Sequence, residues 1–190
     1  LEKQGMAMAV KQSAVPFATA LAGFAVPTFG GLIGWKGTFL LVAALALPAW
    51  LFIPSVSPTK KGTYSSRREM WRLSHLRLLA LAGAFSAAAV VTVSGFLTTS
   101  AKNAGYSNGT AGLILGLGGL LMILSRLSWG YLADRFHFDR FKAVSASLLI
   151  GSVAFILFAV ESKVSIAVGS LFIFGIGWSW PGLALLGIIE

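Results

Sequence analysis

Long apolar segments with few charged residues alternate with short polar segments along the whole chain. The apolar segments cover approximately residues 6–31, 38–53, 76–98, 109–132, 141–160 and 164–189. A helix needs about 20 predominantly apolar residues to cross a bilayer. Because lipid cannot hydrogen-bond to an exposed backbone, each segment is predicted to be a helix. The pattern therefore predicts an all-α, polytopic membrane protein with about six transmembrane helices.

Prolines in the first and last of these segments predict local bends. Pro16 and Pro27 lie in the first segment, and Pro181 lies in the last. A proline removes one backbone donor and frees the carbonyl about one turn earlier. We therefore expect bent helices at both ends of the chain.

The composition agrees with a lipid environment. Hydrophobic residues make up 56% of the 190 residues and charged residues only 11%, with a mean hydropathy of +0.82, whereas a soluble domain is about 25% charged. The chain has no cysteine, and His75 and His137 lie beside basic loops. The sequence therefore indicates no disulfide framework, no metal site and no cofactor.

The basic residues fall mostly on one side of the predicted membrane. Only Lys36, Lys102 and Lys163 of the 15 Lys and Arg residues lie on the other side, and Arg126 is counted with the majority, near the end of its segment. By the positive-inside rule, the basic side is cytoplasmic. The net charge of +9 thus indicates orientation in a lipid bilayer, and no nucleic-acid partner is expected.

The charged stretch between the fourth and fifth segments carries a motif. Residues 130–135 read GYLADR and are followed by Arg140 and Lys142. This stretch resembles the signature loop of the major facilitator superfamily, Gly-x-x-x-Asp-Arg/Lys followed by basic residues. It departs from that pattern at His137 and Phe138, where a glycine and a basic residue are usual.

The resemblance implies an architecture. In this family twelve helices form two halves of six, a long cytoplasmic loop joins the halves, and a weaker signature loop follows the eighth helix. The longest polar stretch here, residues 55–75, lies two segments before the motif. We therefore expect an interior part of a longer protein that resembles helices five to ten. Residues 1–54 would be the last two helices of the N-terminal half, 55–75 the cytoplasmic linker, and 76–190 the first four helices of the C-terminal half.

The resemblance also implies a gate. It places Asp134 against the opposite half, near the start of the first segment around residues 5–9, where the contact would close the cytoplasmic side in one state. Gly130, Arg135 and Arg140 belong to the same motif. The carboxylate would be stabilised by Arg135, by Arg140, or by the positive N-terminus of a neighbouring helix. In the alternative interpretation, Asp134 and Arg135 only end the helix and anchor the topology.

Candidate substrate contacts follow from the family layout, which places the third and sixth segments along a cavity near the midplane. The polar and aromatic candidates are Ser94, Thr98, Trp178, Trp180 and, on the first segment, Gln12. These side chains could instead pack or face lipid. No Asp or Glu lies inside a segment, so any ion or proton coupling would use regions outside this chain.

The fourth segment is rich in glycine, at positions 112, 116, 118 and 119. Small residues four apart permit close approach of two helices. We therefore expect this segment to pack tightly against a neighbour, on a smooth surface that would also let helices rock.

These features favour a secondary transporter, not an enzyme, that moves a small solute by alternating access in the plasma (inner) membrane. A sensor or scaffold with the same fold remains open. An intramembrane protease would need a histidine within the membrane to activate a serine such as Ser94, and neither histidine lies inside a segment. A channel is disfavoured because paired half-helix motifs and a carbonyl filter are missing. The substrate does not follow from the sequence.

Overall fold

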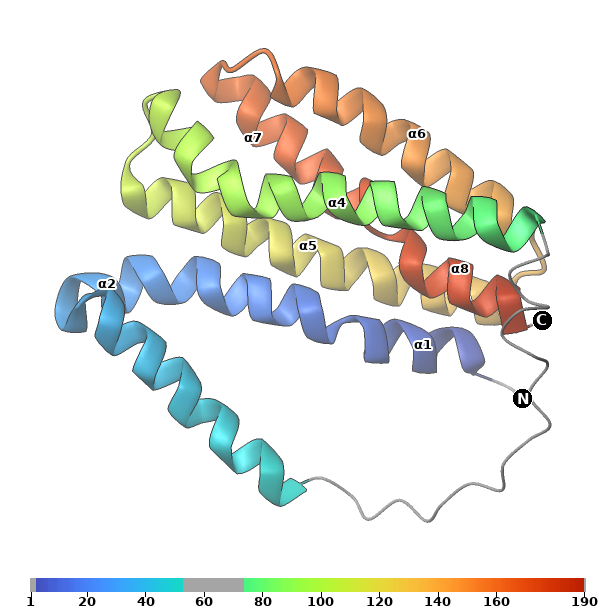
Figure 1. Cartoon of the computed structure of the whole chain (residues 1–190), viewed down its shortest axis with the longest axis horizontal. Coiled ribbons are helices and arrows are strands. Elements are labelled where there is room, and N and C mark those ends of the chain that lie inside the picture. Colours follow the sequence, from blue (N-terminus) through green and yellow to red (C-terminus); the bar gives the residue numbers. More distant parts are fainter. Residues whose placement is uncertain (1–2, 53–73, 190) are drawn as a thin grey trace.

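The computed structural model describes residues 3–52 and 74–189, and these are almost entirely helical (Figure 1). The elements in chain order are α1 (Gln4–Gln12), α2 (Ala14–Ala46), η1 (Leu47–Phe52), α4 (Ser74–Asn103), α5 (Asn108–Arg135), α6 (Arg140–Phe158), α7 (Lys163–Phe172), η2 (Ile173–Gly177) and α8 (Trp180–Ile189). No strand occurs in these two ranges, so the prediction of an all-α fold is confirmed. The expected linker, 55–75, lies outside the described residues except at Ser74 and His75, where α4 begins.

Helices cover most of the described part of each expected segment. Four helices are long and apolar enough to cross a membrane: Arg77–Asn103, Asn108–Arg135, Arg140–Phe158 and Lys163–Ile188. The first two expected segments form a bent pair, Gln4–Ala25 and Pro27–Ala44, at an angle of 93°. If this pair counts as one span, the described residues hold up to five spans.

A kink further along α2 contains one non-helical residue. Gly34 has φ 68° and ψ 171°, a backbone conformation that is essentially restricted to glycine. The break between the two arms of the bent pair directly precedes Pro27, where a bend was expected. Pro27 lies inside α2, and Pro16 follows the break at Ser13 that separates α1 from α2.

The sixth segment is also broken. The π-helix η2 separates α7 from α8, and the amide of Trp178 donates to the carbonyl of Ile173, five residues earlier, at 3.0 Å. Pro181 is the second residue of α8, where its missing N–H costs nothing because the first turn of a helix has no intrahelical acceptors. Single π-turns of this kind often occur at functional sites.

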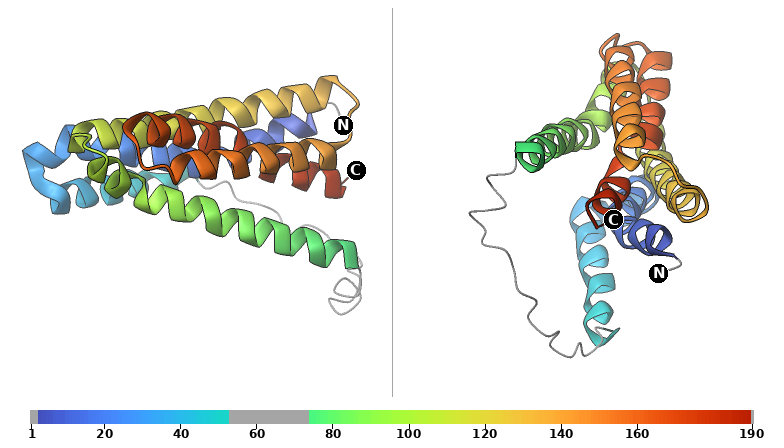
Figure 2. Two further views of the ribbon diagram at one scale, coloured as in Figure 1. Left: turned by 90° about the horizontal axis from the view of Figure 1, so that it is seen from above. Right: turned by 90° about the vertical axis from the view of Figure 1, so that its right-hand side faces the viewer.

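Helix α5 lies at the centre of the arrangement. It packs against α1 and α2 on one side and against α4, α7, η2 and α8 on the other (Figure 1). The second arm of α2 stands away from this cluster (Figure 2). The fully buried core includes Leu97, Ile173 and Phe174.

The outer surface is apolar. Leu32, Phe39, Leu40 and Phe85 are between 71% and 80% exposed, and many other large apolar side chains are also exposed. Such a surface would be unfavourable in water and suits the hydrocarbon core of a bilayer.

Candidate functional site

The carboxylate of Asp134, at the end of α5, binds the start of α1. Its Oδ1 accepts a hydrogen bond from the Gly5 amide at 2.7 Å, and its Oδ2 accepts one from the Met6 amide at 2.9 Å. The first amides of a helix have no intrahelical acceptor, and the positive end of the helix dipole favours an anion. The helix's own N-cap residue, Lys3, makes no side-chain capping bond. Asp134 therefore caps α1 from a helix almost 130 residues away in sequence.

A close crossing of two glycines makes this contact possible. A Cβ atom added at Gly130 would lie 2.6 Å from the Cβ of Ala9 and 2.8 Å from the carbonyl oxygen of Gly5. A Cβ added at Gly5 would lie 2.6 Å from the carbonyl oxygen of Gly130 and 2.8 Å from Oδ1 of Asp134. Both positions therefore need glycine for α1 and α5 to approach this closely.

The same close approach continues along the two helices. Added Cβ atoms would lie 2.3 Å from the Gly116 amide for Gly23, 2.5 Å from Pro27 for Gly112, and 2.6 Å from the Ala20 amide for Gly119. The glycine-rich face of α5 is thus the surface that meets α1 and α2, and we call this contact the α1/α2–α5 seam. Gly118 lies outside this seam and faces the ring of Phe174.

The two arginines of the motif, Arg135 and Arg140, lie in different environments. Arg140 is 8% exposed and donates to the carbonyls of Ala133 at 2.8 Å and Phe136 at 3.1 Å, so it caps the C-terminal end of α5. Its guanidinium lies 4.5 Å from the centre of the Phe138 ring. Phe138, one of the two positions at which the sequence departs from the family motif, thus contacts Arg140. Arg135 is exposed, with its guanidinium 6.0 Å from the ring of Phe136. The described partners of Asp134 are therefore helix amides.

Arg126 is a functional candidate that the sequence analysis missed. Its side chain is 3% exposed, and it lies nine residues before the end of α5, about 13 Å at 1.5 Å per residue. Nη1 donates to the carbonyl of Gln12, and Nη2 donates to that of Trp178 at 3.4 Å. The guanidinium thus joins the two helix breaks, at the end of α1 and at the end of η2. The available signal was a lone cation within an otherwise apolar run, which usually marks function.

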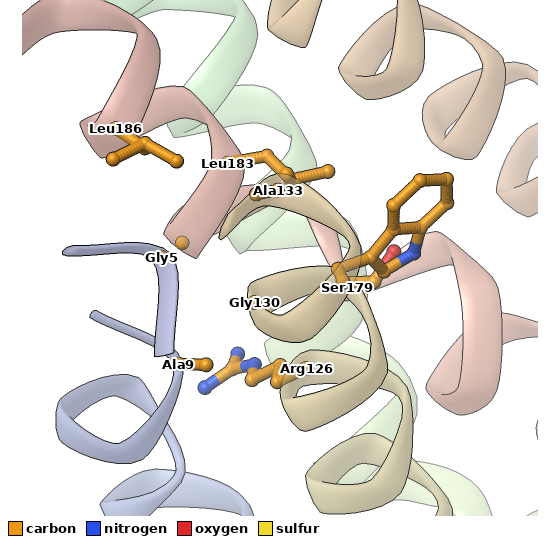
Figure 3. A pocket seen from close by; sticks show the side chains of 10 residues that line it. Gly5, Ala9, Arg126, Gly130, Ala133, Ser179, Leu183 and Leu186 are labelled. Carbon is orange, nitrogen blue, oxygen red and sulfur yellow. The ribbon is translucent and has the colours of Figure 1, made fainter. Parts of the chain in front are cut away.

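A small cavity lies beside Arg126, between α1, α5 and α8 (Figure 3). Its volume is about 10 Å³, enough for roughly one water molecule. Ala9, Gly130, Ser179 and Leu183 are among the lining residues. The α1/α2–α5 seam is therefore closed at this level, with no room for a solute.

The candidate substrate residues lie in different places. The Trp180 ring lies against Gly83 of α4, in an apolar groove of about 370 Å³ between α4 and α8, and its buried Nε1 has no hydrogen-bond partner. Ser94 and Thr98 are half-buried on α4, at least 11 residues beyond Gly83, or roughly 16 Å along the helix.

Two further candidates meet at Arg126 through backbone rather than side-chain atoms. The Gln12 and Trp178 carbonyls both accept from its guanidinium, while the Trp178 side chain packs against the buried core that includes Leu97 and Phe174. In the described ranges, no group of three or more His, Asp or Glu residues is placed to hold a metal ion.

Comparison with known proteins gives one match. The family model described as Major Facilitator Superfamily matches residues 1–189, nearly the whole chain. No curated protein and no solved structure matches the chain.

Proposed function

Since the chain belongs to the Major Facilitator Superfamily and is a multi-pass membrane transporter of that kind, we propose that it moves a small solute across the plasma membrane by alternating access. In this mechanism two half-transporters rock about a central site, so that the site opens to one side at a time. The observation that carries the proposal is the capping of α1 by Asp134.

The two partners of that contact belong to different halves in this proposal. Residues 1–54, which contain α1 and α2, end the N-terminal half, and residues 76–190, which contain α5, begin the C-terminal half. Residues 55–75 form the cytoplasmic linker between them. On this assignment the α1/α2–α5 seam is an interface between the halves.

The Asp134 contact then works as a latch on the cytoplasmic side. Both carboxylate oxygens bind α1 rather than the end of α5, which favours a latch over a local helix stop. Capping by a side chain contributes about 0.5–2 kcal/mol. That magnitude suits a gate, because it biases a two-state equilibrium strongly without locking it.

A pair of introduced spin labels can test the latch, and the absence of native cysteine makes the labelling specific. We would label the exposed residues Ala7 on α1 and Tyr131 on α5 and measure the distance distribution in lipid nanodiscs. Asp134→Asn should shift the population towards longer distances, because Oδ2 is replaced by an amide that cannot accept the Met6 N–H bond.

Asp139→Asn provides a matched control. Asp139 is another acid in the same loop, and it accepts from the Lys142 amide at 3.1 Å as the N-cap of α6. Asn and Asp cap helices about equally well, so this variant should leave the α1–α5 distance unchanged. An Asp134→Asn distribution that overlays the wild-type and control distributions would contradict the latch.

A further inference from the structure

Arg126 carries a buried charge without an anionic partner among the residues that the structure describes. The acidic residues in the described ranges are Asp134, Asp139 and Glu161, and none of them forms an ion pair with Arg126. Asp134 instead binds the amides of α1. An ionised group buried in an apolar region is unfavourable unless it is paired and fully hydrogen-bonded, so this guanidinium is well suited to receive an anion.

Its donors are only partly used. A guanidinium has five N–H groups, and two of them have acceptors here, the carbonyls of Gln12 and Trp178. The bond from Nη2 to Trp178 is long, at 3.4 Å, and the buried Nε has no acceptor. The edge formed by Nε and Nη2 therefore presents two nearly parallel donors, the arrangement that binds a carboxylate through both oxygens.

Small residues surround Arg126, and the cavity beside it lies close to both helix breaks. The adjacent cavity is lined by Ala9, Gly130, Ser179 and Gly182, among others, and Figure 3 shows the Arg126 guanidinium beside Ala9 of α1. The present volume of about 10 Å³ does not admit a carboxylate. Separation of α1 from α5 would enlarge this space and remove the Gln12 carbonyl from Nη1 at the same time.

We propose that Arg126 binds the carboxylate of an organic-acid solute when α1 and α5 separate. The bond from Nη1 to the Gln12 carbonyl holds the guanidinium in the closed seam, and in the open seam, where that bond is broken, the carboxylate binds the edge formed by Nε and Nη2. The solute therefore stabilises the conformation in which the seam is open. This inference rests on the proposed function, because it requires the two halves to move apart.

Acetate is a suitable probe, since it is the bare functional group, and acetamide is its uncharged counterpart. We would measure thermal unfolding of the full native protein in nanodiscs, through tryptophan fluorescence, with acetate, acetamide or chloride at equal ionic strength. Acetate alone should raise the unfolding temperature of the wild type. Arg126→Gln should abolish that shift, and Arg126→Lys, which keeps the charge but loses the two-donor edge, should weaken acetate binding about tenfold, the value of one lost hydrogen bond to a charged group.

Lys102→Gln is the matched control, since it removes one exposed cation at the end of α4. It should respond to acetate like the wild type. Equal shifts with acetate and chloride, an acetate shift that survives in Arg126→Gln, or no acetate shift in the wild type would each overturn the carboxylate site. If Arg126→Gln does not fold, Arg126→Lys decides the question by its reduced affinity.

The distance between labels at Ala7 and Tyr131 separates this inference from the proposed function. If that distance has closed and open populations and acetate does not favour the open one, the transporter proposal stands and the Arg126 site fails. A single closed population under every condition, in Asp134→Asn as well as in the wild type, would remove the proposed function itself.

Discussion

Gly130→Ala offers a sharp test of the seam, because it adds a single methyl group at the closest crossing of α1 and α5. The new Cβ would meet the Cβ of Ala9 at 2.6 Å and the carbonyl oxygen of Gly5 at 2.8 Å. Neither atom can rotate away, because one is the first atom of a side chain and the other belongs to the backbone. Restoring ordinary contacts of about 3.5–4.0 Å requires α1 to move by roughly 1 Å.

That displacement has a direct consequence for Asp134. Its bonds to the Gly5 and Met6 amides, at 2.7 and 2.9 Å, would lengthen to roughly 3.7–3.9 Å, beyond hydrogen-bond range. Overpacking of this kind costs about 1–3 kcal/mol. If the cost falls on the closed state alone, the ratio of closed to open molecules should fall about 5- to 150-fold.

The assay is the distance distribution between labels at Ala7 and Tyr131, together with thermal unfolding of the same sample. Gly95→Ala is the matched control, because it is the same substitution in the middle of α4, where an added Cβ meets nothing within 4 Å. The control should keep the wild-type distance and gain up to about 1 kcal/mol of stability from helix propensity. A Gly130→Ala protein with the wild-type distance and stability would refute the close crossing.

Two other substitutions test the elements that position the site. Gly34→Ala places a side chain at φ 68° and should cost about 1–3 kcal/mol of stability, measured by thermal unfolding; a variant as stable as the wild type would show that the kink at Gly34 does not depend on this conformation. Arg140→Gln removes the donors to the Ala133 and Phe136 carbonyls and the contact with Phe138, and should cost about 1–3 kcal/mol; faster amide hydrogen exchange should appear at the end of α5, and unchanged exchange there would contradict the capping role.

Much of the fold followed from the sequence because its causes are local. Each long apolar segment had to form a helix, since a backbone in lipid must satisfy its own hydrogen bonds within the segment. The helix starts are also local, as at Ser107, whose hydroxyl accepts from the Thr110 amide three residues later at 3.1 Å. The glycines of the fourth segment indicated a close helix contact for the same reason, because the absence of a side chain is visible in the sequence itself.

The partners of those features were decided by the tertiary structure. The sequence does not say that Gly116 faces Gly23 or that Gly118 faces Phe174, because both choices depend on where distant helices cross. The expected contact of Asp134 with the start of α1 is present in the structure. That expectation came from family resemblance, since no local rule joins residues so far apart. Its role as a gate stays a prediction.

Arg126 shows most clearly where sequence reasoning ends. The sequence places it among the cytoplasmic cations, because nothing along the chain fixes its depth or its neighbours. The fold buries it and brings to it the Gln12 and Trp178 carbonyls, from two separate helix breaks. The sequence by itself thus determined the helices, through local hydrogen bonding and hydropathy, and its charge distribution predicts their orientation. Only the packing of α1, α5 and α8 decided which buried cation has donors to spare, because its acceptors come from residues 114 and 52 positions away along the chain.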